Sequence, residues 1–416
     1  MANLVKTNKE VIYRGYIVVL AVIAFMAQVF IHDRVEGRLI DDWIAFGKMI
    51  PWTLCPMFIC AVLGAYYTDL GYKRLVGTIG VLIMLAATIV QFGSMAWMGG
   101  LDIEDEVITA KLNGYELRLP IAIFLVASSF LRGGAVACLL SVLSDVRNST
   151  RCREEVGAFA SFAVLISVAT FALMVMNVEL EWGNIAIISF IYLLMLIPAM
   201  LMILRNKQND IANDDQVREY VSEKCTEHVP ILSIMILVIS LFSFASYFKF
   251  LPVHWRQSRI FWGRESIFAL MVSAITFAVG LFLLRKNQKL REKVNGTLVG
   301  SIMLLVGFPL AAAIGEESLL ILVPQIMNGF ALSLIVSSTL PNVINIPCKW
   351  YSMTWVGITL AIIVLSYIMR KVLFNMADGL NTTSIAVYII YPLIALVLII
   401  LSLWRRPPSE LSSEIM

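Results

Sequence analysis

Charged residues are scarce in this chain. Only 15% of its 416 residues are Asp, Glu, Lys or Arg, whereas 59% are hydrophobic. Soluble domains carry about 25% charged residues, so the composition excludes an ordinary water-soluble globular protein. The formal net charge of +3 is too small to argue for nucleic acid as a partner, and we expect none.

Residues that serve metal and nucleotide chemistry are also scarce. The chain has three histidines, His32, His228 and His254, with no pair at helical spacing, so we expect no metal site. The six cysteines do not follow zinc-binding spacing, and we interpret them as buried thiols. The sequence contains no P-loop, the glycine-rich motif that holds nucleotide phosphates. We therefore expect neither an enzyme nor an ATP-driven pump, and we expect no cofactor.

Long apolar runs are what the chain does contain. A membrane span needs about 20 apolar residues, and runs of that length recur with short polar breaks. The predicted spans cover residues 13–35, 44–68, 75–98, 119–143, 156–178, 185–204, 229–251, 266–284, 294–314, 319–339, 351–373 and 384–404. The first run is too long for a cleaved signal peptide and lacks an A-x-A cleavage site. These runs predict an all-α, multi-pass protein of twelve transmembrane helices in a lipid bilayer.

A polar stretch divides the predicted spans into two groups of six. Residues 205–228 carry mixed charges with several Asn and Asp residues, and we interpret them as a cytoplasmic linker. It separates a six-helix bundle over residues 1–204 from a second bundle and short tail over residues 229–416. Most Lys and Arg residues fall in loops on the side of the N-terminus, which the positive-inside rule places in the cytoplasm. Both termini are then cytoplasmic, and we expect the plasma (inner) membrane.

The break between the second and third predicted spans carries the sharpest motif. It begins at Gly64 and reads Thr-Asp69-Leu-Gly71-Tyr-Lys73-Arg74 at its end. Gly71 permits a tight turn, the basic pair anchors the cytoplasmic face, and Asp69 can pair locally or meet the next helix's N-terminus. The alternative interpretation is an ordinary helix-loop-helix with positive charge on its inner side.

This break resembles the signature loop of the major facilitator superfamily. Gly64 and Gly71 keep the family's register, as do the two basic residues. Thr68 stands where the family's Asp usually stands, and Asp69 comes one place later. The resemblance implies two six-helix bundles with the solute site at the midplane. It also implies gating contacts from five residues: Asp69, Gly71, Lys73, Arg74 and, in the charged link after the fourth span, Asp145.

Arg132 lies in the middle of the fourth predicted span, where the family often has an arginine. An uncompensated guanidinium at the centre of a span costs about 2.5–3.5 kcal/mol on insertion scales. We therefore expect Arg132 to face a cavity, where its planar fork can bind a carboxylate or phosphate through two hydrogen bonds. Gly133 and Gly134 beside it allow close approach of a neighbouring helix. The alternative is that an internal acid neutralises Arg132 and the pair holds helices together.

Charged residues close the first predicted span. A basic start, an apolar run and then Asp33-Arg34-Val35 resemble the first helix of the anion:cation symporter branch, many members of which move organic anions, often with protons. The resemblance implies proton coupling at Asp33, which His32 can share because imidazole titrates near neutral pH, and a substrate contact at Arg34. The alternative is that these charged residues form the solvated outer end of the helix. At a rise of 1.5 Å per residue, Asp33 lies about 30 Å from Tyr13 along the helix, which is the outer boundary of the membrane.

Three further polar residues within or near spans are candidates for solute contact: Gln28, Lys249 and Asn328. The two amides can instead form hydrogen bonds between helices, and Lys249 can extend to the outer surface. After the seventh predicted span, the basic stretch from His254 to Arg264 is interpreted as a solvated outer loop.

These features predict a monomeric secondary active transporter of the major facilitator type. It moves a small, anionic organic solute by alternating access, and the proton is the expected coupling ion. Two alternatives stay open. One is a lipid or lysolipid flippase on the same fold, and the other is a non-transporting membrane sensor or assembly factor, for which the short linker and tails leave no signalling domain.

Overall fold

The protein consists of two compact units. The computed structural model describes residues 15–24, 43–100, 109–112, 115–146, 187, 190–197, 231–257, 264–286, 295–314, 319–344, 351–375 and 386–404. Unit 1 holds the described parts of Met1–Cys225 together with Lys349–Val356, and unit 2 holds those of Thr226–Cys348 and Gly357–Met416. The predicted span 156–178 and the predicted linker 205–228 lie outside the described residues.

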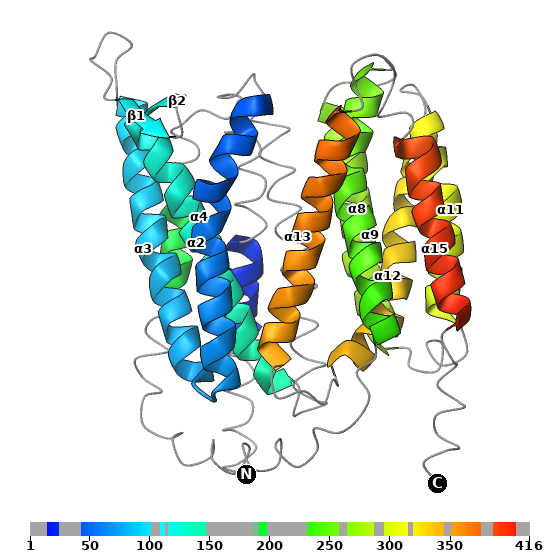
Figure 1. The fold of residues 1–416 in the computed structure, drawn as a ribbon, viewed down its shortest axis with the longest axis horizontal. Helices are drawn as coiled ribbons and strands as arrows, with labels where there is room; N and C mark the ends of the chain where they lie inside the picture. Colours follow the sequence, from blue (N-terminus) through cyan, green and yellow to red (C-terminus); the bar gives the residue numbers. More distant parts are fainter. Residues whose placement is uncertain are drawn as a thin grey trace. The chain divides into compact units, whose positions relative to one another are not determined.

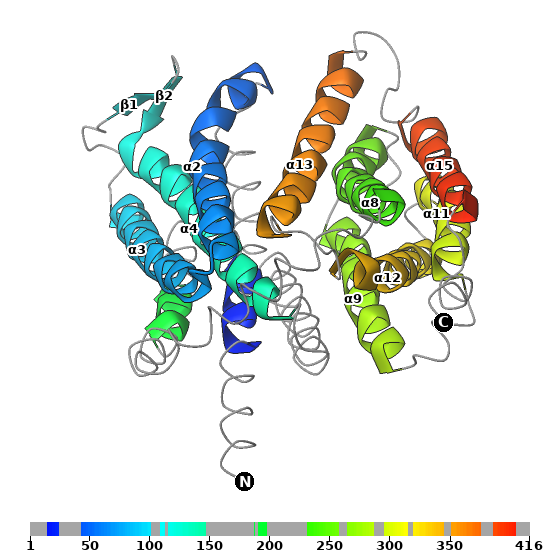
Figure 2. The ribbon, with the colours of Figure 1, turned by 60° about the horizontal axis from the view of Figure 1, so that its bottom comes forward.

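Three long helices form most of the described part of unit 1. They are α2 (Trp43–Asp69), α3 (Lys73–Gly100) and α4 (Leu119–Val146). They run side by side, and α4 packs against both of the others (Figures 1 and 2). Two hydrogen bonds join the helical segments 15–24 and 190–197: the Tyr16 hydroxyl donates to the Met195 carbonyl at 2.7 Å, and the buried Tyr192 hydroxyl donates to the Leu20 carbonyl at 3.0 Å.

Unit 2 is built around one central helix. Its helices are α8 (Ile231–Gln257), α9 (Arg264–Lys286), α11 (Gly296–Ala313), α12 (Leu322–Ile344), α13 (Tyr351–Asn375, from Gly357 onward) and α15 (Tyr391–Trp404). A short 3₁₀ turn, Leu319–Ile321, leads into α12, and a π-helical turn, Ala386–Ile390, leads into α15. Helix α12 packs against α8, α9 and α11, so its side chains form much of the interior.

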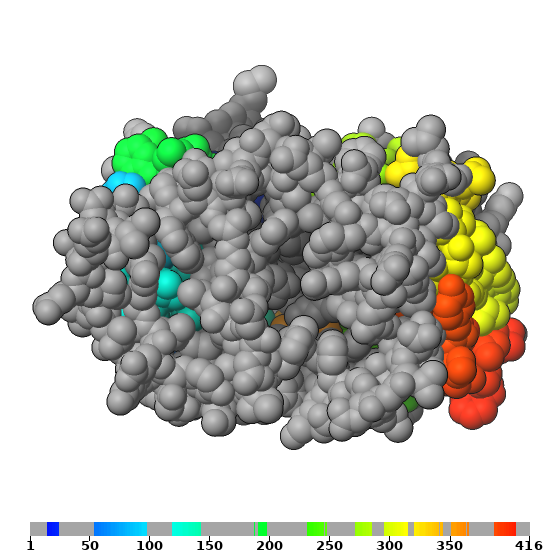
Figure 3. Space-filling model, turned by 90° about the horizontal axis from the view of Figure 1, so that it is seen from above, coloured from blue at the N-terminus to red at the C-terminus, as the bar shows by residue number. Residues whose placement is uncertain are grey.

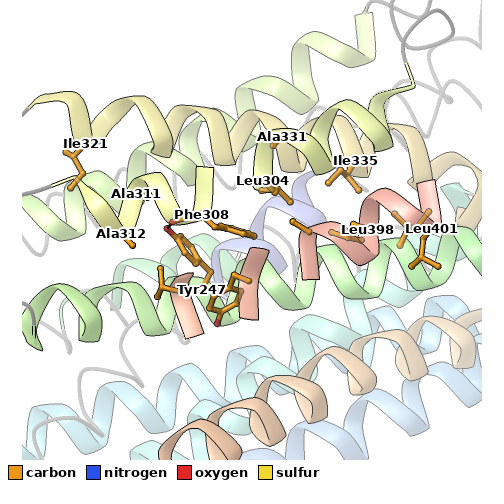
Figure 4. Packing of buried hydrophobic residues seen from close by; sticks show 14 residues of the cluster. Tyr247, Leu304, Phe308, Ala311, Ala312, Ile321, Ala331, Ile335, Leu398 and Leu401 are labelled. Carbon is orange, nitrogen blue, oxygen red and sulfur yellow. Dashed lines mark hydrogen bonds between the residues drawn. The ribbon is translucent and has the colours of Figure 1, made fainter. Parts of the chain in front are cut away.

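Aromatic residues fill the centre of unit 2 (Figure 4). Tyr247 of α8 packs between Phe308 of α11 and Tyr391 of α15, with ring centroids 4.4 Å and 5.3 Å away. The Tyr247 hydroxyl donates to the Phe308 carbonyl at 2.8 Å, so the hydroxyl of this buried ring has a hydrogen-bond partner. Leu304 and Ala331 belong to the same buried cluster, which ties α11 to α12.

The surface of the helices is apolar, as a lipid environment requires. Among the described residues, five helices are long and apolar enough to cross a membrane, and five shorter apolar helices coincide with other predicted spans. Side chains such as Val306 of α11 (51% exposed) and Leu393 of α15 (54% exposed) point outward. Figure 3 shows α11 in yellow and α15 in red at the surface of unit 2. The chain is therefore an integral membrane protein.

A β-hairpin between α3 and α4 departs from the all-α prediction. Strands β1 (Thr109–Leu112) and β2 (Tyr115–Arg118) pair antiparallel, with Thr109 opposite Arg118. The sequence between them is Asn113-Gly114, a pair that favours two-residue hairpin turns. The hydropathy pattern misses the hairpin because neither strand carries an apolar run.

Several helices extend beyond the apolar runs that predicted them. Helix α8 continues to Gln257 and includes His254, although the stretch from His254 to Arg264 was expected to be a solvated loop. A helix satisfies its own backbone hydrogen bonds in water as well as in lipid. Hydropathy therefore marks where a helix meets lipid, and not where it ends.

Candidate functional site

The turn between α2 and α3 organises the candidate site. Gly71 has a φ of 95°, a left-handed conformation that glycine adopts without a steric penalty. The Tyr72 amide donates to the Tyr67 carbonyl at 2.9 Å and the Gly71 amide to the Thr68 carbonyl at 3.0 Å. These two bonds form a Schellman motif, and the Tyr67 and Tyr72 rings contact edge to face at 6.4 Å between centroids. The turn places the last residue of α2, Asp69, beside the start of α13.

Asp69 caps the N-terminus of α13. Its Oδ1 accepts a hydrogen bond from the Ser352 amide at 2.8 Å, and its Oδ2 accepts one from the Met353 amide at 3.0 Å. The first amides of a helix have no partners within the helix, and the helix dipole is positive at this end. A carboxylate that accepts two of them therefore stabilises the first turn of α13 by both hydrogen bonding and charge.

The first turns of α13 also pack on unit 1 through apolar contacts. Ala61 and Ala65 of α2 cluster with Leu140 of α4 and with Val356 of α13, and Met353 packs against this cluster. Small side chains on α2 let the two helices approach closely. Lys349–Val356 belong to unit 1 for this reason, while α13 from Gly357 onward belongs to unit 2.

The neighbours of Asp69 in the signature loop have different surroundings. The Thr68 hydroxyl donates to the Gly64 carbonyl at 2.6 Å within α2, and Thr68 is only 4% exposed. Lys73 begins α3 and is half-buried, whereas Arg74 is exposed. The turn thus brings together the predicted gating residues Asp69, Gly71, Lys73 and Arg74, and Asp69 binds the first turn of α13.

Arg132 occupies the midpoint of α4 and is 6% exposed. Among the side chains that the structure describes, it is the only charged one that is buried. Two glycines follow it, and each allows a close helix contact. A Cβ on Gly133 would lie 2.7 Å from Cβ of Cys60 in α2, and a Cβ on Gly134 would lie 2.7 Å from the Gly80 carbonyl oxygen in α3. Helix α4 is therefore held tightly on two sides around Arg132.

The face of α4 that carries Arg132 can be identified from its neighbours. Residues four apart on a helix lie above one another, so Arg132, Val136 and Leu140 share a face. Val136 and Leu140 belong to the cluster with the first turns of α13. Arg132 lies one turn before Val136 on this face of α4. It is therefore on the side of α4 that packs against the first turns of α13.

The remaining predicted site residues are placed as follows. Gln28, His32, Asp33 and Arg34 lie outside the described residues. Asp145 lies in the last turn of α4, and Lys249 lies in α8. Asn328 lies in α12 and is completely buried. Among the residues that the structure describes, no group of three His, Cys, Asp or Glu side chains could hold a metal ion.

Sequence reasoning did not identify the partner of Asp69. The partner consists of two backbone amides, at Ser352 and Met353, and every residue except proline carries such a group. No residue type at these positions could have indicated the contact. Only the packing of α13 against α2 and α4 reveals it.

Comparison with solved structures identifies the fold. The major facilitator superfamily transporter FucP, in its outward conformation, matches with a TM-score of 0.61 and 11% sequence identity, over 95% of this chain and 98% of FucP. The xylose transporter XylE from E. coli, in an inward-open conformation, matches with a TM-score of 0.55 and 11% identity, over 96% of each chain. No protein family model and no curated protein sequence matches the chain. The protein has the major facilitator fold.

Proposed function

We propose that this chain, which has the fold of major facilitator superfamily transporters, is a monomeric secondary active transporter of the plasma (inner) membrane. It moves a small anionic organic solute by alternating access and couples that movement to protons. The observation that carries the proposal is Arg132, a buried guanidinium at the midpoint of a membrane-spanning helix. FucP and XylE, which share the fold, are transporters, and further solved matches of the same fold are described as proton symporters.

Arg132 is the proposed binding group for the anion of the solute. Inserting a guanidinium within a span costs about 2.5–3.5 kcal/mol on insertion scales, and charged side chains at this depth usually serve a function. Its planar fork forms paired hydrogen bonds with a carboxylate or phosphate. The close packing at Gly133 and Gly134 fixes α4 at this level, which limits the movement of the arginine and so orients it for a ligand.

Asp69 is the proposed gating residue. Alternating access requires contacts that form in one state of the transporter and break in another. A carboxylate at a helix N-terminus contributes about 0.3–1 kcal/mol when exposed and up to about 2 kcal/mol when partly buried. That energy is small enough to be overcome during a cycle. The cap at Ser352 and Met353, supported by Gly71, Lys73 and Arg74 in the same turn and by Asp145 in α4, would hold the start of α13 in one state.

Proton coupling is proposed at Asp33 and His32, with Arg34 as their partner. A carboxylate beside an arginine holds a proton less tightly than one that loses that partner while it stays out of water. A transport cycle that makes and breaks the pair would therefore bind and release a proton. Gln28 and Lys249 complete the proposed set of solute contacts, together with Asn328.

The experiment that tests the proposal is uptake into liposomes that contain the purified protein. A pH gradient is imposed, and a panel of labelled small organic acids is offered beside a neutral sugar and a short-chain lysolipid. We expect Arg132→Ala to lower uptake of the transported acid by about tenfold to a hundredfold, the effect of losing a hydrogen-bonded charge pair. Arg118→Ala, at the end of β2, is the matched control and should leave uptake unchanged.

Two results would overturn the proposal. If Arg132→Ala transports the acid as well as the unmodified protein, Arg132 does not bind the solute. If the unmodified protein moves the lysolipid and none of the acids, the chain is a flippase.

A further inference from the structure

Helix α13 passes from one unit to the other at a glycine. It runs without a break from Tyr351 to Asn375 (Figure 1). Its residues up to Val356 belong to unit 1, where the Asp69 carboxylate and an apolar cluster hold them. From Gly357 onward the helix belongs to unit 2. One continuous helix is therefore shared by two compact units.

Gly357 is not required by close packing. At Gly80 of α3 and Gly134 of α4, a Cβ would come within 3 Å of a neighbouring helix, whereas a Cβ at Gly357 would meet nothing within 4 Å. Among the glycines whose surroundings the structure describes, only Gly93 of α3 has the same open space. Glycine in the interior of a helix is less favourable than alanine, because its backbone has more freedom to lose. Gly357 therefore weakens the helix without allowing a closer contact.

The face of α13 that carries Gly357 has room for a bend. Leu360 and Val364 lie three and seven residues later, on the same face, and they are 38% and 44% exposed. No other described helix packs extensively along α13, whereas α12 packs against three of its neighbours. Val356, in contrast, is only 6% exposed within its cluster. The helix is thus held firmly before Gly357 and loosely on this face after it.

We propose that Gly357 is a hinge in α13. The first turns, residues 351–356, dock on unit 1 in one state of the transporter and leave it in another, while the helix beyond Gly357 stays with unit 2. Bending at the glycine changes the direction of the docked turns and leaves the packing of the rest in place. The inference rests on the proposed transport function and adds the point at which α13 bends during the cycle.

Gly357→Ala tests the hinge, because the added methyl group fits the open space and favours a straight helix. We expect an unfolding temperature in detergent at least equal to that of the unmodified protein. The maximal rate of acid uptake into liposomes should fall roughly fivefold, which corresponds to the about 1 kcal/mol by which alanine favours a helix over glycine. The KM for the acid should stay unchanged, because the proposed solute contacts remain in place.

Two further variants separate bending from a general effect of alanine. Gly93→Ala makes the same change at the other open glycine and should leave the uptake rate unchanged. Gly357→Ala combined with Ala361→Gly returns a glycine to the same face of α13, one turn later. This double variant should recover much of the lost rate.

A second measurement follows the docked turns without any solute. In a variant without native cysteines, Ala65→Cys introduces a thiol on α2 in the cluster that holds Val356, where Ala65 is 0% exposed. A water-soluble maleimide should react with this thiol when the first turns of α13 leave unit 1, and Gly357→Ala should slow the reaction about fivefold. Ala137→Cys, at a buried position of α4 beside Gly64, is the control and should react at the same rate with and without Gly357→Ala.

The outcomes separate the hinge from the proposed function. The hinge is overturned if Gly357→Ala takes up the acid as fast as Gly93→Ala, or if it leaves the alkylation of Ala65→Cys unchanged. A lower unfolding temperature for Gly357→Ala also overturns it, since the glycine would then be needed for packing. If no acid is taken up but Gly357→Ala slows the alkylation, the hinge stands and the transport proposal is wrong.

Discussion

The adjacent residues Thr68 and Asp69, at the end of α2, have different roles. Successive side chains on an α-helix point about 100° apart, because a turn contains 3.6 residues. The Thr68 hydroxyl therefore turns inward and binds the Gly64 carbonyl, while the Asp69 carboxylate reaches the first turn of α13. The acid stands one place later than in the signature loop that the sequence resembles, yet it still caps a helix.

The cap at Asp69 gives a prediction at the scale of a single residue. Asp69→Asn keeps the shape of the side chain but removes the charge and replaces one acceptor oxygen with a donor. Loss of a helix cap costs about 1 kcal/mol, so we expect a lower thermal unfolding temperature in detergent and slower uptake in liposomes.

Thr68→Val is the control for Asp69→Asn. It removes a hydrogen bond within α2 and leaves the cap intact, so uptake should stay close to that of the unmodified protein. Equal unfolding temperature and equal uptake for Asp69→Asn and the unmodified protein would show that the cap contributes nothing.

At the scale of whole helices, glycine contacts determine how unit 1 is packed. Gly134 of α4 and Gly80 of α3 face each other: a Cβ on Gly134 would lie 2.7 Å from the Gly80 carbonyl oxygen, and a Cβ on Gly80 would lie 2.8 Å from the Gly134 carbonyl oxygen. The obstacle is backbone in both cases, so a rotamer change cannot relieve the clash. Such close contact is the usual way in which membrane helices associate.

This contact predicts the effect of a single methyl group. Gly134→Ala must push α3 and α4 apart, and overpacking of this kind costs about 1–3 kcal/mol. We expect a clear fall in the unfolding temperature of the detergent-solubilised protein. Gly93→Ala in α3 is the matched control, because a Cβ there meets nothing within 4 Å.

Alanine favours a helix over glycine by up to about 1 kcal/mol. The control variant Gly93→Ala should therefore be at least as stable as the unmodified protein. An unfolding temperature for Gly134→Ala equal to that of Gly93→Ala would mean that the two helices do not pack as closely as the structure shows.

At the scale of the molecule, α13 connects the two units along the chain. The start of α13, up to Val356, packs with α2 and α4 in unit 1, and from Gly357 onward α13 belongs to unit 2. A transporter that works by alternating access must release such a contact in part of its cycle. The apolar contacts and the Asp69 cap are the interactions that this release would break.

A reversible cross-link tests whether that release is required. Ala65 lies four residues before Asp69 on α2, and Val356 follows the capped amides on α13; both belong to one cluster. In a variant without native cysteines, Ala65→Cys with Val356→Cys should form a disulfide under oxidation, stop uptake, and recover uptake on reduction.

Each cysteine variant alone is the control for the cross-link and should transport under both conditions. Undiminished uptake by the oxidised double variant, with the disulfide verified by gel mobility, would show that the start of α13 does not leave unit 1 during transport.

The sequence alone determined where the described helices form and which charged side chain is buried. Each long described helix overlaps a predicted apolar run, because the lipid bilayer imposes a length and a polarity on every segment that crosses it. The burial of Arg132 follows from its position in the middle of such a run. The resemblance to the anion:cation symporter branch stays a prediction, since identities of 11–15% with the solved structures show the fold alone.

The tertiary structure decided which groups meet. It brought the Asp69 carboxylate to backbone amides nearly three hundred positions later in the chain, and it paired the Ser273 hydroxyl of α9 with the Gln325 side chain of α12. Hydropathy is a property of a segment, but the partner of a side chain depends on how each helix is rotated and which helix lies beside it. Those quantities arise from packing between distant segments, which no local pattern encodes.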